Sequence, residues 1–122
     1  MFLKDMKVAY LIDFYQDLLD GHTLGALKAY YNDDLSLSEI ASGVGISRQG
    51  IRHLIKKGED QLLFYEERLR LSERFGELDA CAEKLSALRS SLSDKGLGDE
   101  ARLLDEVITV LLKGNQDVPE SY

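Results

Sequence analysis

A short stretch of the chain, residues 47–57, carries the side chains that proteins use to bind nucleic acid. When this stretch is drawn as a helix with Ile51, Leu54 and Ile55 turned inward, six polar residues occupy its outer side. These are Arg48, Gln49, Arg52, His53, Lys56 and Lys57. Arginine and glutamine read guanine and adenine edges in a major groove and lysine suits phosphates, while Ser47 and the first helix amides would hold one more phosphate. The stretch therefore predicts a nucleic-acid interface, and the alternative is a solvated basic face on a packing helix.

The distribution of charge favours such an interface more than the total charge does. The chain carries 15 Lys and Arg against 22 Asp and Glu, a net charge of −7, which disfavours simple binding to nucleic acid. Within residues 36–58, however, four basic side chains accompany a single acidic one, Glu39. If all four met phosphates, the salt slope would be about −3.6 for one protomer, with non-specific binding on the order of 10⁻⁴ to 10⁻⁶ M. Tight binding would then need a dimer that places two units roughly 34 Å apart.

The elements that must position this face form a helix-turn-helix at residues 36–58. The run Ser36-Leu37-Ser38-Glu39 has the pattern of a capping box, in which the serine binds the third amide and the glutamate reaches back to the cap. The motif needs a small residue where the helices cross, a glycine at the turn and apolar residues between the helices. The residues expected in these roles are Ile40, Ala41, Val44, Gly45, Ile46, Ile51 and Leu54.

Helical periodicity extends over almost the whole chain, whose single proline is Pro119. Two helices are expected before residue 36, and Thr23 is the expected N-cap of the second. Another helix is expected from residue 59 to about residue 92, and a last one ends at Gly114. The predicted fold class is all-α, with a four-helix head at residues 1–58, a long C-terminal helical hairpin at residues 59–114 and a flexible tail at residues 115–122.

The long helix carries a seam of apolar residues. Leu71, Phe75, Leu78, Ala82 and Leu85 follow one another at steps of four and three. Either the last helix folds back and covers this seam within the chain, or part of the seam meets a second copy in a homodimer. The spacing alone leaves both arrangements open.

Composition and spacing argue against several classes of function. With 44% hydrophobic and 30% charged residues, we expect a soluble folded protein; no apolar run is long enough to cross a membrane, and the first residues lack the features of a secretory signal. The single cysteine, Cys81, fits a reducing compartment, so the cytoplasm is expected. His22, His53 and Cys81 lack the spacing of a metal site, and no residues combine a nucleophile with a positioned base. We expect no enzymatic activity, no cofactor and no metal.

Several segments of the first 71 residues resemble the YlxM family of bacterial proteins. The most specific is the run YYNDDLSLSEIA from Tyr30 to Ala41, which is followed by Gly45-Ile46-Ser47-Arg48-Gln49. The likeness covers roughly residues 7–71, and the same region more distantly resembles region 4 of sigma factors. The chain departs from the family at Gly50, where alanine is usual, and at residues 52–54.

The resemblance implies a sigma-region-4-like head in a DNA-binding regulatory or accessory protein associated with the signal recognition particle pathway. In that case the residues that bind DNA are Ser47 and the outer face described above. The alternative is an interaction adaptor that binds the signal recognition particle, through its protein or its RNA, without reading DNA. In the adaptor the helical hairpin would make the contact.

Overall fold

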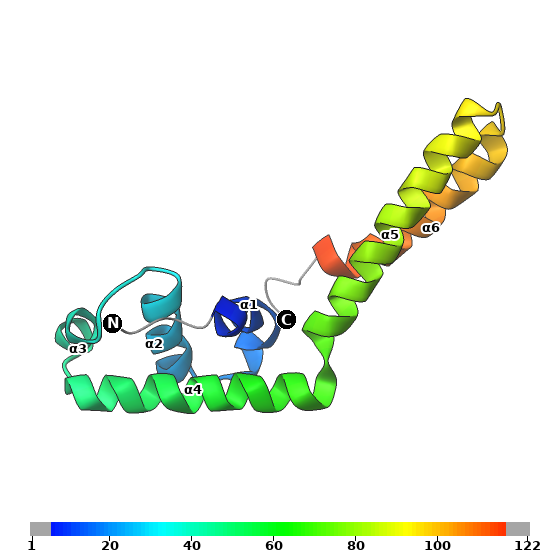
Figure 1. Ribbon diagram of the computed structural model, residues 1–122. Helices are drawn as coiled ribbons and strands as arrows, with labels where there is room; N and C mark the ends of the chain where they lie inside the picture. Colours follow the sequence, from blue (N-terminus) through cyan, green and yellow to red (C-terminus); the bar gives the residue numbers. More distant parts are fainter. Residues whose placement is uncertain (1–5, 117–122) are drawn as a thin grey trace. The chain divides into compact units, whose positions relative to one another are not determined.

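The computed structural model describes residues 6–116, with side chains described as far as Lys113 (Figure 1). The described part contains six α-helices, one short 3₁₀ helix and no strand, which confirms the all-α class. In chain order the elements are α1 (Met6–Tyr15), η1 (Gln16–Leu18), α2 (Gly21–Tyr31), α3 (Leu37–Val44), α4 (Arg48–Leu69), α5 (Leu71–Asp94) and α6 (Gly98–Gln116). The chain divides into two compact units, Met1–Ser72 and Glu73–Tyr122.

Helix α4 is the scaffold of the first unit. Helices α1, α2 and α3 each pack against it and lie along one side of it in Figure 1. The core is apolar, and its most deeply buried hydrophobic side chains are Leu11, Ile12, Tyr15, Leu27, Ile51 and Leu62. The buried residues of α4 are Ile51, Ile55, Gly58 and Leu62. They form one stripe along the helix that packs against α1, α2 and α3, while the other side of α4 is exposed to solvent.

Helices α2 and α4 approach each other most closely at Gly58. A Cβ atom at this position would lie 2.5 Å from Cδ1 of Leu27 and 2.8 Å from Cγ2 of Thr23. Both neighbours belong to α2, and both are fully buried. The crossing of the two helices therefore requires a residue without a side chain at position 58.

The N-cap of α2 is Asp20, which corrects the expectation that Thr23 caps this helix. The Asp20 carboxylate accepts hydrogen bonds from the Thr23 amide at 2.8 Å and from the Thr23 hydroxyl at 2.9 Å. Thr23 is fully buried, so its hydroxyl needs this partner. The residue with the capping role is therefore the aspartate three positions earlier.

Two expected boundaries are corrected by the extent of α4. Residue 58, the expected end of the head, lies inside this helix, and the first compact unit continues to Ser72. The helix expected over residues 59–92 is interrupted at Arg70, which adopts the left-handed conformation with φ = 54° and caps the end of α4. Neither glycine nor proline marks this position, so the sequence carries no ordinary signal for the break.

A hydrogen-bond cluster fixes the chain on both sides of Arg70. The Tyr15 hydroxyl donates to Oε1 of Glu66 at 2.6 Å and accepts from the Leu71 amide at 3.0 Å. Oε1 of Glu66 also accepts from the Ser72 amide at 3.2 Å, and Oε2 accepts from the Ser72 hydroxyl. The first amides of a helix have no partner within the helix. Tyr15 and Glu66 therefore satisfy two amides at the start of α5.

The second unit is a helical hairpin of α5 and α6. The connecting turn places Gly96 at φ = 82°, and the Leu97 amide donates to the Leu92 carbonyl at 2.9 Å. Arg89 and Asp105 form an ion pair of 2.8 Å between the two helices. The start of the expected tail, residues 115 and 116, is still helical, and residues 117–122 lie outside the described residues. None of the described helices combines the length and apolar character needed to cross a membrane.

Candidate nucleic-acid interface

Helices α3 and α4 form the predicted helix-turn-helix, and both ends of its turn are capped. The capping box is present, with Ser36 and Glu39 each accepting a hydrogen bond of 3.1 Å from the other's amide. Gly45 ends α3 in the left-handed conformation at φ = 75°, where a Cβ atom would be strained. Ser47 then caps α4 by accepting from the Gly50 amide at 3.0 Å. The turn is thus set by local chemistry.

The apolar residues expected between the two helices are only partly where the sequence places them. Ile40, Ala41 and Ile51 are buried and Leu54 is half-buried. Val44 and Ile46, however, are exposed by 62% and 44%. Val44 is the last residue of α3 and Ile46 lies in the turn, so neither faces the core. Their expected role in the core is therefore incorrect.

The residues predicted to bind nucleic acid all lie on the solvent side of the first half of α4 or at its cap. Ser47, Arg48, Gln49, Arg52, His53, Lys56 and Lys57 are all exposed. Arg48 and Arg52 form no ion pair with any described residue. They lie four residues apart, so their guanidinium groups share one side of the helix.

The two lysines, by contrast, already have carboxylate partners. Nζ of Lys56 lies 3.1 Å from Asp60, one helical turn along α4, and Nζ of Lys57 lies 3.2 Å from Asp20. Exposed pairs of this kind contribute at most about 1 kcal/mol, so a phosphate can replace the carboxylate. The pKa of Asp20 is lowered to about 2, first by the Thr23 amide, then by the Thr23 hydroxyl and Lys57. Asp20 therefore keeps its negative charge at any ordinary pH.

Charge is divided sharply along α4. Residues 48–57 contain four basic side chains and no acidic one. Residues 58–69 contain Glu59, Asp60, Glu66 and Glu67 against Arg68 alone. Only the N-terminal half of this helix is therefore suited to meet a polyanion.

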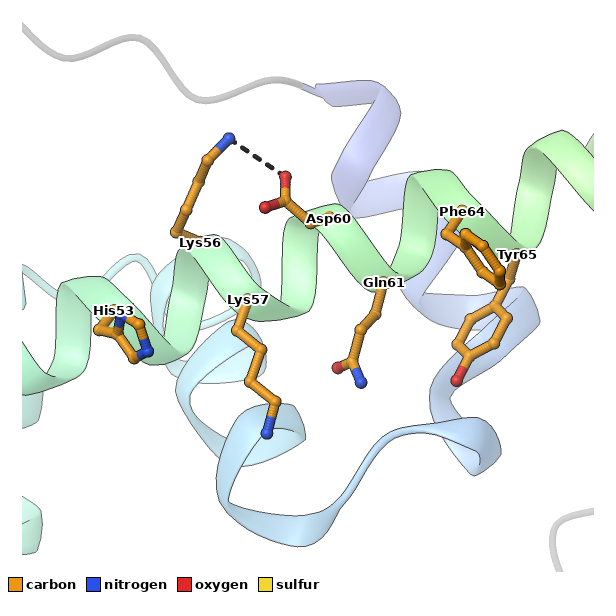
Figure 2. Close-up of a pocket in the computed structure, with 7 residues that line it drawn as sticks. All are labelled: His53, Lys56, Lys57, Asp60, Gln61, Phe64 and Tyr65. Carbon is orange, nitrogen blue, oxygen red and sulfur yellow. Dashed lines mark ion pairs between the residues drawn. The ribbon is translucent and has the colours of Figure 1, made fainter.

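A depression of about 580 Å³ lies along α4, and Figure 2 shows the side chains that line it. Its lining residues are His53, Lys56, Lys57, Asp60, Gln61, Phe64 and Tyr65. In the view, Lys56 reaches toward Asp60, whereas Lys57 and Gln61 extend to the other side of the helix. Because all seven residues come from a single helix, this is an open strip of surface. It has the form of a docking surface and not of an enclosed small-molecule site.

Sequence reasoning missed the two acidic partners of the lysines. The pair of Lys56 and Asp60 has the i, i+4 spacing that a sequence does reveal. The pair of Lys57 and Asp20 joins residues 37 positions apart and gives no such signal. The other residues weighed as ligands, His22 and Cys81, are exposed, and no three potential metal ligands lie together in the described part of the chain.

Comparison with known proteins agrees with this geometry. Residues 2–97 match the profile of a family described as "UPF0122: Putative helix-turn-helix protein, YlxM / p13 like". A relative from Bacillus velezensis is 40% identical over 92 residues, which cover 75% of this chain and 84% of the relative. A relative from Bacillus pumilus is 38% identical over 88% of this chain and 96% of its own length. A relative from Bacillus cereus is 38% identical over 91% of this chain and 99% of its own length. The likeness thus extends beyond residue 71, the limit expected from the motifs, and includes all of α5.

Proposed function

Because the chain belongs to the UPF0122 family of YlxM- and p13-like helix-turn-helix proteins, we propose that it is a DNA-binding regulatory or accessory protein. It reads duplex DNA with the N-terminal half of α4. One observation carries the proposal: directly after a capped helix-turn-helix turn, the exposed side of α4 presents four cations and no carboxylate over ten residues. Helices of this motif contact base edges with their N-terminal residues.

Different residues of this face have different roles in the complex. Arg48, Gln49 and Arg52 read base edges, because they lie nearest the helix N-terminus and no described residue competes for the two guanidinium groups. Lys56 and Lys57 exchange Asp60 and Asp20 for phosphates. The Ser47 hydroxyl stays on the Gly50 amide, and the neighbouring amides face a phosphate.

We further propose that this activity serves the signal recognition particle pathway, which is the role that the resemblance to the YlxM family implies. A second candidate function, the adaptor that binds the particle's protein or RNA, is favoured by the mixed surface farther along α4. There Arg68 lies 4.1 Å above the exposed Phe64 ring, and half-buried Tyr65 lines the same strip. Aromatic and cationic side chains together suit RNA as well as protein. The two functions differ in what is bound, which is duplex DNA for the reader and the particle's protein or RNA for the adaptor. They also differ in the residues that bind, which for this adaptor lie on the C-terminal half of α4 and not on the hairpin expected from the sequence.

Fluorescence anisotropy with a labelled mixed-sequence DNA duplex tests the proposal, with wild type and Arg48→Ala/Arg52→Ala at low and physiological salt. We expect micromolar binding by the wild type, a loss of at least about tenfold in the variant and a salt slope smaller by about 2. Arg74→Ala/Lys95→Ala removes the same charge from exposed sites of the second unit, so it is the matched control. Equal losses in both double variants would contradict a specific role for the face.

The same titration with an RNA hairpin separates the adaptor from the DNA reader. Binding of RNA without binding of duplex DNA favours the adaptor. Absence of any nucleic-acid binding at low salt would reject both the DNA reader and the RNA-binding form of the adaptor.

A further inference from the structure

Helix α6 carries apolar residues on two sides. Ala101, Leu104 and Ile108 are buried or half-buried, as expected for the side that faces α5. A second stripe consists of Leu103, Val107 and Val110, which are exposed by 62%, 43% and 72%. Their spacing of four and three residues places them on one line along the helix. Packing against α5 requires only one apolar side of α6, so the second stripe is not explained by the contact between these two helices.

The two edges of the hairpin differ in character. The edge that contains Asp105 is polar, because Asp105 pairs with Arg89 and is accompanied by Ser90 and Thr109. At 100° per residue, the stripe on α6 lies on the opposite edge, and Leu88 of α5, which is 50% exposed, lies on that same edge. The apolar surface of the hairpin is therefore the stripe of α6 with Leu88 beside it, whereas the neighbours of Leu88 along α5, Lys84 and Ser91, are polar and exposed.

The second unit buries little of its own apolar surface. Ala82 and Ala101 are its only buried side chains in the described part of the chain. The exposed face is about 30 Å long, the length of α6, and about 20 Å wide, the width of two packed helices. Its outline of about 600 Å² per partner corresponds to about 1,200 Å² for a pair, which is the lower end of the range for specific interfaces. Apolar patches of a few hundred Å² or more mark association sites.

The charges beside the stripe indicate which molecule covers it. Asp99, Glu106 and Lys113 follow one another at intervals of seven residues and line one flank of the stripe. An antiparallel pair of α6 helices brings the start of one helix next to the end of the other. Asp99, which lies 3.5 Å from Arg102 of its own helix, then also faces Lys113 of a second copy, and the same contact occurs twice by symmetry. Antiparallel pairing also aligns the helix dipoles favourably.

We propose that the apolar face of the α5–α6 hairpin is an interface between two copies of this chain, which together form a four-helix bundle. Leu103 packs against Val110 of the second copy, and Val107 packs against its own symmetry mate near the two-fold axis. Two attractive Asp99–Lys113 contacts close the ends, and they outnumber the single repulsive contact at the centre, where Glu106 lies near its own mate. The inference goes beyond the proposed function, because the interface uses no residue of the nucleic-acid face.

Sedimentation equilibrium of the full chain without DNA tests the interface. We expect twice the chain mass of 13.7 kDa at micromolar concentrations for the wild type. Val107→Lys buries an unpaired charge at the interface and raises the dimer dissociation constant at least about 100-fold. Ser90→Lys adds the same charge to the polar edge and leaves the dimer intact. Both substitutions are at exposed sites, so we expect both variants to keep their helices. Circular dichroism checks this expectation.

A charge exchange tests the antiparallel register separately. Asp99→Lys and Lys113→Asp each weaken the dimer several-fold, and the double exchange restores it. A wild-type chain of monomer mass would overturn the proposal, as would a dimer that Val107→Lys leaves intact. A double exchange weaker than either single variant would overturn the register. None of these results depends on DNA, so failure here is distinguishable from failure of the proposed function.

Discussion

Tyr15 is fully buried, and its hydroxyl nevertheless has a partner on each side. It donates to Glu66 and accepts from the Leu71 amide. Burial, and after it the hydrogen bond to Glu66, raises the pKa of Tyr15 from 10.0 to about 12. A single neutral phenol thus connects the end of α1 with the last turn of α4 and the first residue of α5.

The stability of the fold should reflect this phenol at alkaline pH. Because the pKa of Tyr15 is higher in the folded chain than in the unfolded one, its contribution is complete below pH 10 and is lost as the pH rises through 12. The loss is at most about 2.7 kcal/mol. We expect urea unfolding to show this fall in the wild type and a smaller one in Tyr15→Phe, which is also less stable by about 1–3 kcal/mol at neutral pH.

Tyr10→Phe is the control for this experiment, because the Tyr10 ring is exposed and stacks on Phe14 at a centroid distance of 5.0 Å. Its stability and pH profile should match those of the wild type. An unchanged alkaline fall in Tyr15→Phe would mean that another group titrates in this range.

At the scale of the elements, the crossing of α2 and α4 depends on the absence of a side chain at Gly58. Gly58→Ala places a methyl group against Leu27 and Thr23, and neither neighbour can move into free space. We expect a loss of about 1–3 kcal/mol in the free energy of unfolding, in spite of the better helix propensity of alanine. Thermal and urea unfolding measure it.

Gly76→Ala provides the opposite case within the same protein. A Cβ atom at Gly76 of α5 meets nothing within 4 Å. The substitution should therefore stabilise the chain by up to about 1 kcal/mol. Equal effects of the two substitutions would contradict a close packing contact at Gly58.

Most of the helices, and the helix-turn-helix itself, could be predicted from the sequence because their signals are local. The capping box at Ser36 and Glu39, the left-handed glycine at position 45 and the N-cap at Ser47 each depend on contacts within four residues. The outer face of α4 followed from the same periodicity, because its inner residues are apolar.

The features that could not be predicted depend on contacts between distant residues. Gly58 and the acidic residues after it suggest the end of a helix, yet α4 continues because Leu62 packs into the core. The break at Arg70 depends on Tyr15, which lies 56 residues before Leu71. Lys57 meets Asp20 only in the folded chain. The apolar pattern also predicted that Val44 and Ile46 lie in the core, but both are exposed. The pattern does not show at which residue a helix ends.

At the scale of the whole molecule, seven excess negative charges oppose binding to DNA, and Asp20 opposes it most directly by holding Lys57. Asp20→Asn keeps the oxygen that caps α2, since asparagine and aspartate are equivalent caps. The amide nitrogen that replaces the other oxygen donates to the Thr23 hydroxyl and releases Lys57. If the proposed function is correct, the variant binds duplex DNA several-fold more tightly, with a salt slope larger by up to about 1. Fluorescence anisotropy over a salt series measures both.

Asp79→Asn is the matched control, because it removes the same charge from an exposed site of the second unit. An equal gain from both variants would show that only the net charge matters. A weaker complex with Asp20→Asn would mean that the ion pair positions Lys57 for the phosphate.

The opposed charges of the two halves of α4 also affect the collision that precedes any complex. Ten residues of helix span about 15 Å, whereas electrostatic forces extend about 8 Å at physiological ionic strength and about 30 Å at 0.01 M. In dilute salt the acidic half of α4 therefore repels an approaching duplex. Only an encounter in which the N-terminal end of α4 meets the duplex first avoids this repulsion. At physiological salt this repulsion is screened while contacts at the tip remain attractive. If the protein binds DNA as proposed, ionic strength thus selects the orientation of α4 in the encounter.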